Sequence, residues 1–301
     1  MRSPFVQPLH LLTGKGGVGK TTIAAALALE AARRGGRPIV VELGHRASLG
    51  RVLGAHGAIG HEPLEVAPGV FATNVDLDHA LSDYLARRLR SRALTRRVAS
   101  DPGLRRFFDA APAVPELLTL ERIERLLESF DPVIVDLDAT GHALMFLELP
   151  AVLASIAPSG PIGELVRGLG RLLSDRERTR LHLVTLPAKL PIEETLELHA
   201  RLVADGHAPL GGLLVNRMPE RPLPSRWDAV AARLVAQVSA PADHEALALA
   251  LAACAAHDEA VRAMARLDAT GLPRVVLPDL AVEPDHDALA RLGRSAAEAL
   301  A

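Results

Sequence analysis

The residues best suited to chemistry lie near the start of the chain, where positions 14–21 read GKGGVGKT. This spacing fits the pattern G-x-x-x-x-G-K-[ST], in which glycines let backbone N–H groups turn inward around a phosphate. We expect Lys20 to reach the β- and γ-phosphates of a nucleotide and the Thr21 hydroxyl to bind Mg²⁺. The predicted nucleotide-binding residues of this stretch are Gly14, Lys15, Gly16, Gly17, Val18, Gly19, Lys20, Thr21 and Thr22.

The segments on both sides of this loop agree with the motif. Residues 6–12 are mostly apolar and predict a strand, and residues 22–32 are rich in Ala and Leu and predict a helix. A strand, the loop and a helix in this order form the context that the motif requires, and the start of the helix adds the positive end of its dipole. Lys15 is a second lysine that an ordinary loop of this kind does not need. It is either a solvated loop lysine or a functional residue.

Two further strand ends carry polar residues that suit a nucleotide site. Residues 133–136 read VIVD, an apolar strand that ends in Asp136, which we expect to hold the magnesium water shell together with Thr21. The following loop contains Asp138 and then Gly141, whose backbone permits close approach, so this loop is either a γ-phosphate sensor or a plain strand-to-helix turn. Asn216 follows the apolar segment 211–215, where its side chain could bond the edge of adenine.

Continuous apolar strands alternate with helical segments along the whole chain. Such strands are typical of a parallel sheet covered on both faces, so the fold class is α/β with helices on both sides of a mostly parallel sheet, as in P-loop NTPases. The predicted strands are residues 6–12, 38–43, one within 66–76, 133–136, 181–186, 211–215 and 275–277. We find no repeat or linker, and expect one domain, 1–301, with a small helical subdomain formed by residues of about 77–130 and 143–180.

Composition excludes several classes of protein. Aromatic residues make up 3% of the 301 residues and the formal net charge is −2, which argues against base-stacking platforms and against a global basic footprint for nucleic acid. The single cysteine, Cys254, rules out internal disulfides and Cys-x-x-Cys metal sites. The N-terminus has no long apolar segment, and the longest apolar run, residues 246–256, is too short to span a bilayer. We therefore expect a soluble, cytoplasmic protein without an integral membrane segment.

Two helical regions have alternative interpretations. Residues 77–99 carry six arginines between Arg87 and Arg97, which form either a solvated helix face or a contact with an acidic partner or an anionic lipid surface. Residues 143–174 are apolar and interrupted by Pro and Gly, which indicates short helices that either face the core or form a groove for a client or partner.

Taken together, these motifs resemble the ArsA/Get-type ATPases, a branch of the MinD group of deviant Walker A ATPases. The form GKGGVGKT resembles the group's Walker A loop, DLDATGH at 136–142 is similar to the family's switch II, and VTLP at 184–187 with Glu194 and Thr195 resembles its V-T-x-P and E-T segments. The resemblance implies binding of ATP or ADP with Mg²⁺ and a nucleotide-dependent dimer in which Lys15 crosses to the nucleotide of the other subunit. It also implies that Asn216, Arg217, Pro278 and Asp279 lie near the base. The candidate catalytic residues are Lys15, Lys20 and Asp138, the last as a possible substitute from switch II.

The sequence departs from the family at switch I, which reads D-P-A-H before Ser or Asn and Leu. Alignment on Ser48 and Leu49 places Gly44 at the position of the aspartate that orients the attacking water. Glu42, Asp138 or His45 are the possible substitutes. The cysteines that bridge zinc or bind arsenite in parts of the family are absent, which argues against arsenite transport.

Three functions follow from these observations. The first is an active ATPase that dimerises, as a homodimer or with a paralogue, and moves a hydrophobic or membrane-bound client. The second is a poorly hydrolysing regulatory subunit that pairs with an intact paralogue. The replacement of the switch I aspartate by Gly44 favours this second function. The third, a MinD/ParA-like positioning ATPase, lacks support because the last helix has no basic bias.

Overall fold

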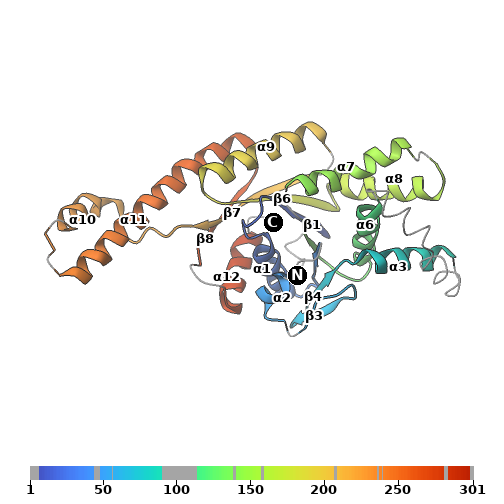
Figure 1. Cartoon of the computed structure of the whole chain (residues 1–301), viewed down its shortest axis with the longest axis horizontal. Helices are drawn as coiled ribbons and strands as arrows, with labels where there is room; N and C mark the ends of the chain where they lie inside the picture. The colour runs from blue at the N-terminus through green and yellow to red at the C-terminus, as the bar shows by residue number, and fades with distance from the viewer. Residues whose placement is uncertain are drawn as a thin grey trace.

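The computed structural model describes residues 7–43, 48–55, 57–89, 114–137, 140–156, 159–206, 209–235, 237–238, 240–280 and 284–298. Within these ranges, eight strands form one sheet in the order β3-β4-β2-β5-β1-β6-β7-β8 (Figure 1). The strands are β1 (Leu9–Thr13), β2 (Ile39–Glu42), β3 (Leu64–Ala67), β4 (Val70–Asn74), β5 (Val133–Asp136), β6 (Thr179–Thr185), β7 (Leu210–Met218) and β8 (Arg274–Pro278). All neighbouring pairs are parallel except β3 with β4, which is antiparallel. The predicted fold class, a mostly parallel α/β sheet, is confirmed.

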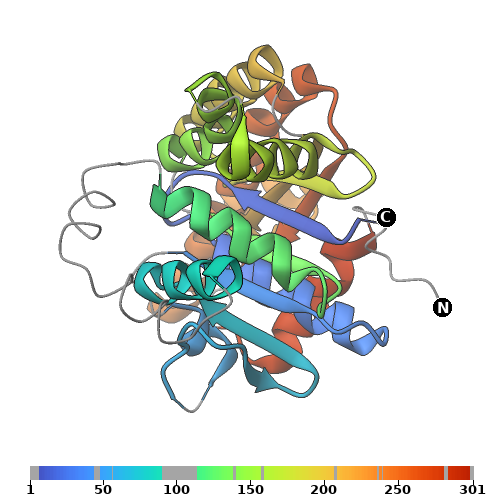
Figure 2. The ribbon, with the colours of Figure 1, turned by 90° about the vertical axis from the view of Figure 1, so that its right-hand side faces the viewer.

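Helices cover both faces of the sheet. The α-helices are α1 (Lys20–Arg33), α2 (Ser48–Leu53), α3 (Leu77–Leu89), α6 (Val114–Leu126), α7 (Thr140–Ile156), α8 (Gly160–Ser174), α9 (Lys189–Asp205), α10 (Asp228–Val235), α11 (Pro241–Met264) and α12 (His286–Glu298). The 3₁₀ turns are η1 (Ser225–Trp227) and η2 (Ala265–Thr270). One buried apolar cluster joins the sheet to α6, α7, α8 and α9, and a second joins its other face to α1, α2 and α12. The two layers can be followed in Figure 2.

The alternation of side chains in β5 shows why both faces need cover. Val133 and Val135 belong to the cluster on the α6–α9 side, whereas Ile134 belongs to the cluster on the α1 side, and all three are fully buried. Successive side chains of a strand point to opposite faces, so an uninterrupted apolar strand must lie between two helical layers. Large aliphatic residues in these positions therefore fix β5 at the centre of the sheet, next to β1.

Two segments differ in detail from the sequence expectation. Residues 66–76 hold β4, but β3 precedes it in an antiparallel hairpin whose turn includes Gly69 at a φ of 72°. A left-handed conformation at that glycine reverses the chain direction, and the apolar pattern alone does not show it. The sequence pattern predicts two late helices, at 226–238 and 244–267. The structure has α10 and then α11, which starts at Pro241 because proline is well suited to the first turn of a helix.

The helices α10 and α11 form an arm. The chain leaves the carboxyl end of β7, and α10 and the first part of α11 lie beyond the edge of the sheet (Figure 1). Arg221 connects α10 to α11 through ion pairs with Asp228 on α10, at 2.6 Å, and with Asp258 on α11, at 3.3 Å. No helix within the described ranges is both long enough and apolar enough to cross a bilayer.

The predicted helical subdomain is represented by α3, α6, α7 and α8. The helix α3 packs on α6, and α6 in turn contacts α7 and α8. The division of 1–301 into a sheet domain with a helical subdomain stays a prediction. Of the arginine cluster, Arg87 bonds the Glu121 carboxylate on α6, while residues 90–97 lie outside the described ranges.

Candidate nucleotide-binding site

The phosphate-binding loop joins the carboxyl end of β1 to the start of α1, as predicted. At Gly14, with a φ of 153°, a Cβ atom would lie 2.1 Å from the carbonyl oxygen of Val184 on β6. At Gly19, with a φ of 92°, it would lie 2.3 Å from Nδ2 of Asn216 on β7. Atoms at the ends of β6 and β7 therefore leave no room for a side chain at either position, so only glycine fits there. By contrast, the space around the ideal Cβ positions of Gly16 and Gly17 is open.

The side chain of Lys20 is buried and folds back over the loop. Its Nζ donates hydrogen bonds of 2.9 Å to the carbonyl oxygen of Gly14 and 3.1 Å to that of Lys15. A buried ammonium group that is held by two loop carbonyls lies where an anion cradled by the same loop would meet it. The structure thus places Lys20 at the phosphate-binding loop as the motif requires.

Thr21 and Asp136 meet at the edge of the sheet where the parallel strands β1 and β5 end. The Thr21 hydroxyl donates a 2.5 Å hydrogen bond to Oδ2 of Asp136, although 115 residues separate the two in sequence. Asp136 ends β5, and β5 pairs with β1 in a register that sets Asp136 beside Leu12. Hydroxyl and carboxylate oxygens suit Mg²⁺, which is usually held by few protein ligands and by phosphate oxygens. The residues present therefore fit the predicted metal site.

Glu42 ends β2 in the same register as Asp136, but its carboxylate has another task. Its Oε1 accepts hydrogen bonds from the backbone N–H groups of Ser48, at 3.0 Å, and Leu49, at 3.2 Å, and from the Ser48 hydroxyl. A carboxylate at the first turn of α2 satisfies free N–H groups and the positive end of the helix. Of the possible substitutes for the switch I aspartate, Glu42 thus caps a helix, and His45 and Asp138 lie outside the described ranges, as does Gly44.

Lys15 has a partner within its own chain. Its Nζ lies 2.5 Å from Oε1 of Glu194 on α9, and both side chains are partly exposed. In the conformation described, Lys15 therefore has a contact within its own subunit.

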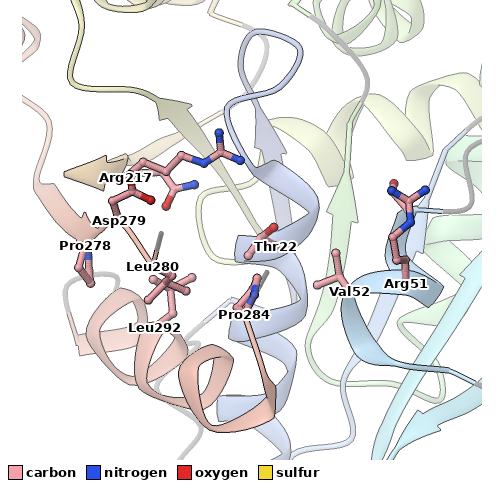
Figure 3. Close-up of a pocket in the computed structure, with 11 residues that line it drawn as sticks. Thr22, Arg51, Val52, Arg217, Pro278, Asp279, Leu280, Pro284 and Leu292 are labelled. Carbon is pink, nitrogen blue, oxygen red and sulfur yellow. The ribbon is translucent and has the colours of Figure 1, made fainter. Parts of the chain in front are cut away.

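A cavity of about 480 Å³ opens beside the loop (Figure 3). It brings together five residues of the predicted nucleotide site, which are Thr22, Asn216, Arg217, Pro278 and Asp279. In Figure 3, Arg217 and Asp279 lie on the side where β7 and β8 end, Thr22 lies on α1, and Arg51 lies on α2. The other lining residues are Ser48, Val52, Leu280, Pro284 and Leu292.

Local geometry sets how β7 and β8 present the predicted base-binding residues. Asn216 donates a 2.9 Å hydrogen bond from Nδ2 to the carbonyl oxygen of Val18, so its amide group serves the loop in this conformation. Arg217 has a φ of 56°, the left-handed conformation that is uncommon for residues other than glycine. The Asp279 N–H donates to the carbonyl oxygen of Met218 at 2.9 Å, which fixes the loop after β8 against the end of β7.

Sequence reasoning missed Arg51. Arg51 and Arg217 both line the cavity, as does the acidic residue Asp279. Within the described ranges neither arginine forms a hydrogen bond or an ion pair. The signal that could have found Arg51 is its position on the helix that follows switch I, three residues beyond Ser48.

Comparison with known proteins agrees with this arrangement. The model of the anion-transporting ATPase family (ArsA) matches residues 8–158. ATPase BagA of Mycobacterium tuberculosis is 31% identical over 322 residues, which cover 96% of this chain and 92% of that protein. An arsenical pump-driving ATPase of Escherichia coli is 31% identical over 67% of this chain, which spans 38% of that protein. An uncharacterized protein of Streptomyces coelicolor is 32% identical over 73% of this chain and 56% of its own length. With its phosphate-binding loop between β1 and α1, the chain belongs to the ArsA family of anion-transporting ATPases and is an ATP-binding P-loop ATPase.

Proposed function

We propose that the protein is a magnesium-dependent ATPase switch that closes into a dimer when ATP is bound and acts on a protein or membrane-associated client. The observation that carries this proposal is the meeting of three groups at one edge of the sheet. The loop offers backbone N–H groups, Lys20 lies over it, and the Thr21 hydroxyl lies against the Asp136 carboxylate.

In this proposal each group has a defined task. The loop N–H groups hold the phosphate oxygens, and Lys20 exchanges its two carbonyl partners for the β- and γ-phosphates. Thr21 and Asp136 would hold Mg²⁺, which neutralises charge that develops on the phosphates. The 480 Å³ cavity takes the ribose and base, with Asn216, Arg217, Pro278 and Asp279 on one side.

A dimer is favoured by the position of Lys15. It extends from the exposed part of the loop, whereas Lys20 of the same loop faces inward. The family resemblance assigns the corresponding lysine to the nucleotide of the opposite subunit, and the partner is a second copy or a paralogue.

The proposed client site lies between α7 and α8. These helices enclose a cavity of about 310 Å³ whose lining includes Leu147, Val166 and Leu173. On α7 the side chains of Met145 and Val152 are also exposed. The exposed apolar surface of Met145 and Val152 supports a hydrophobic client, whereas Leu147, Val166 and Leu173 are buried in the core between these helices and the sheet.

The alternative function, a poorly hydrolysing regulatory subunit, is favoured by Glu42. Because Oε1 of Glu42 caps α2, this carboxylate is not available through that oxygen to orient water. Gly44, at the aspartate position, has no side chain to do so.

Titration calorimetry tests the nucleotide site directly. Lys20→Ala should abolish Mg·ATP binding, and Thr21→Val should remove the magnesium dependence of binding while Thr21→Ser retains it, because only serine keeps the hydroxyl. Unchanged affinity in Lys20→Ala would remove the basis of the assignment. Phosphate release by the protein alone and with any neighbouring paralogue then separates the two functions.

A further inference from the structure

The two lysines of the phosphate-binding loop point in different directions. Lys20 donates to carbonyl oxygens of the loop itself, whereas Lys15 leaves the loop and reaches Glu194 on α9 at 2.5 Å. The helix α9 follows β6, and β6 is the neighbour of β1 in the sheet, so the first turns of α9 lie beside the loop. The fold thus provides a carboxylate for Lys15 within its own subunit.

The Glu194 carboxylate depends on this contact. One oxygen, Oε1, accepts from Lys15, while Oε2 is shielded from solvent and has no hydrogen-bond partner within the described ranges. Departure of Lys15 therefore leaves a partly shielded carboxylate without the cation that it contacts here. Such a group opposes the departure, because a charge that is shielded from water is costly when it is unpaired.

The strength of the pair suits a reversible contact. The side chains are 44% and 35% exposed, and ion pairs of such exposure change an equilibrium constant by at most about fivefold. Phosphate oxygens of a nucleotide carry more negative charge than one carboxylate, so they would compete successfully for the same ammonium group.

We propose that Glu194 is a positioning residue that holds Lys15 within its own subunit and so sets how readily two ATP-loaded copies associate. This inference rests on the proposed ATP-driven dimer, in which Lys15 has to reach the nucleotide of the other subunit. Breaking the Lys15–Glu194 contact is then one of the steps of association, and the carboxylate works against the dimer until nucleotide phosphates replace it.

A neighbouring residue provides a matched control. Glu193 precedes Glu194 on α9, its side chain is 34% exposed, and it forms an ion pair of 2.8 Å with Arg266. Glu193→Gln and Glu194→Gln therefore remove the same charge from the same helix and break one surface ion pair each. Only the second change releases Lys15.

Sedimentation of the full chain with Mg²⁺ and a non-hydrolysable ATP analogue tests the inference. Glu194→Gln should lower the dissociation constant of the dimer by up to about fivefold, while Glu193→Gln should leave it within twofold of the wild type. In a Lys15→Gln background, Glu194→Gln should give no further gain, since the contact is already lost. A purely structural role would instead change the melting temperature of the nucleotide-free protein without this dependence on Lys15.

The outcomes separate this inference from the proposed dimer. If the wild type dimerises and Glu194→Gln behaves like Glu193→Gln, or dimerises less well, the role of Glu194 is refuted and the dimer stands. If Glu194→Gln dimerises where the wild type stays monomeric, the role of Glu194 is supported. If every variant stays monomeric with the analogue, both the dimer and the role of Glu194 are refuted.

Discussion

The side-chain amide of Asn216 donates a 2.9 Å hydrogen bond to the carbonyl oxygen of Val18, which ties the end of β7 to the phosphate-binding loop. The same Nδ2 atom lies so close to Gly19 that a Cβ atom there would stand 2.3 Å away. The loop is therefore shaped from outside by a strand that is two positions away from β1 in the sheet. This contact explains why the loop keeps a left-handed glycine at the start of α1.

The first prediction is that Gly19→Ala destabilises the nucleotide-free protein. Alanine at a φ of 92° is strained, and its Cβ overlaps the Asn216 amide, so we expect a loss of roughly 2–4 kcal/mol in the free energy of unfolding. Urea unfolding measures it. Gly16→Ala is the control, because nothing lies within 4 Å of its Cβ position, and it should stay within about 0.5 kcal/mol. Equal losses in the two variants would contradict the packing argument.

The second prediction concerns the two arginines of the cavity. Arg51→Gln and Arg217→Gln should each weaken ATP binding by at least about tenfold, since charge-assisted hydrogen bonds contribute about 1.5–3 kcal/mol. Arg51 lines the cavity with Thr22 and Ser48 at the start of two helices, so its effect should disappear when adenosine replaces ATP. Calorimetry measures the affinities. Arg233→Gln on α10 removes an exposed charge outside the cavity, and an equal loss there would point to net charge instead.

The contact between Thr21 and Asp136 could be predicted from sequence, although 115 residues separate them. Parallel strands end at the same edge of a sheet, so an acid after an apolar strand is brought to a loop that follows another strand. The phosphate-binding loop follows from a local pattern alone, whereas the order of the strands in the sheet does not.

The contacts of Lys15 and Arg51 could not be predicted in this way. An ion pair between Lys15 and Glu194 depends on how α9 lies beside the loop and on two flexible side chains. Arg51 reaches the cavity because the six-residue helix α2 is oriented by Glu42, a capping contact that no sequence period reveals. Both depend on the placement of helix ends, which hydrophobic patterns do not fix.

The third prediction follows from a buried pair of histidines, His10 on β1 and His182 on β6. His10 Nε2 lies 2.9 Å from the carbonyl oxygen of Gln7, which only accepts, so this nitrogen carries the proton. His10 Nδ1 then accepts from His182 Nε2 at 3.0 Å, and both rings are neutral. Burial lowers the pKa of His10 to about 4, and burial together with His10 and Arg180 holds the pKa of His182 well below its ordinary value.

These lowered pKa values make the protein less stable in acid. As the pH falls through 6.5, the unfolded chain binds protons on both histidines while the folded chain does not, so the free energy of unfolding decreases. For His10 the loss reaches about 3 kcal/mol by pH 4 and then levels off, because the folded protein also binds the proton there. Urea unfolding between pH 7.5 and 4 measures this slope.

The double variant His10→Phe, His182→Phe should flatten the slope. His286→Asn on α12 is the control, because that side chain is exposed and should leave the slope unchanged. A slope that persists in the double variant would assign the acid sensitivity to other groups.

The last prediction is that hydrolysis by this chain alone is slow. In the family that the sequence resembles, an aspartate in switch I orients water in line with the γ-phosphate, and the matched residue here is Gly44. Loss of a positioned catalytic group costs ~10²–10⁴ in rate. Glu42, two residues earlier, uses Oε1 to cap α2 at Ser48 and Leu49, so that oxygen does not orient water in this conformation.

Some turnover should survive, because Lys15, Lys20 and the magnesium site still stabilise charge on the phosphates. A steady-state phosphate-release assay on the wild type, Gly44→Asp and Asp138→Ala tests the argument, and Gly44→Asp should raise the rate. If the wild type is as fast as ordinary members of the family and Gly44→Asp adds nothing, the replacement in switch I is not the limiting feature. If Asp138→Ala then stops turnover, the carboxylate that orients the water comes from switch II, two residues after Asp136, and the catalytic group has moved from the end of β2 to the end of β5.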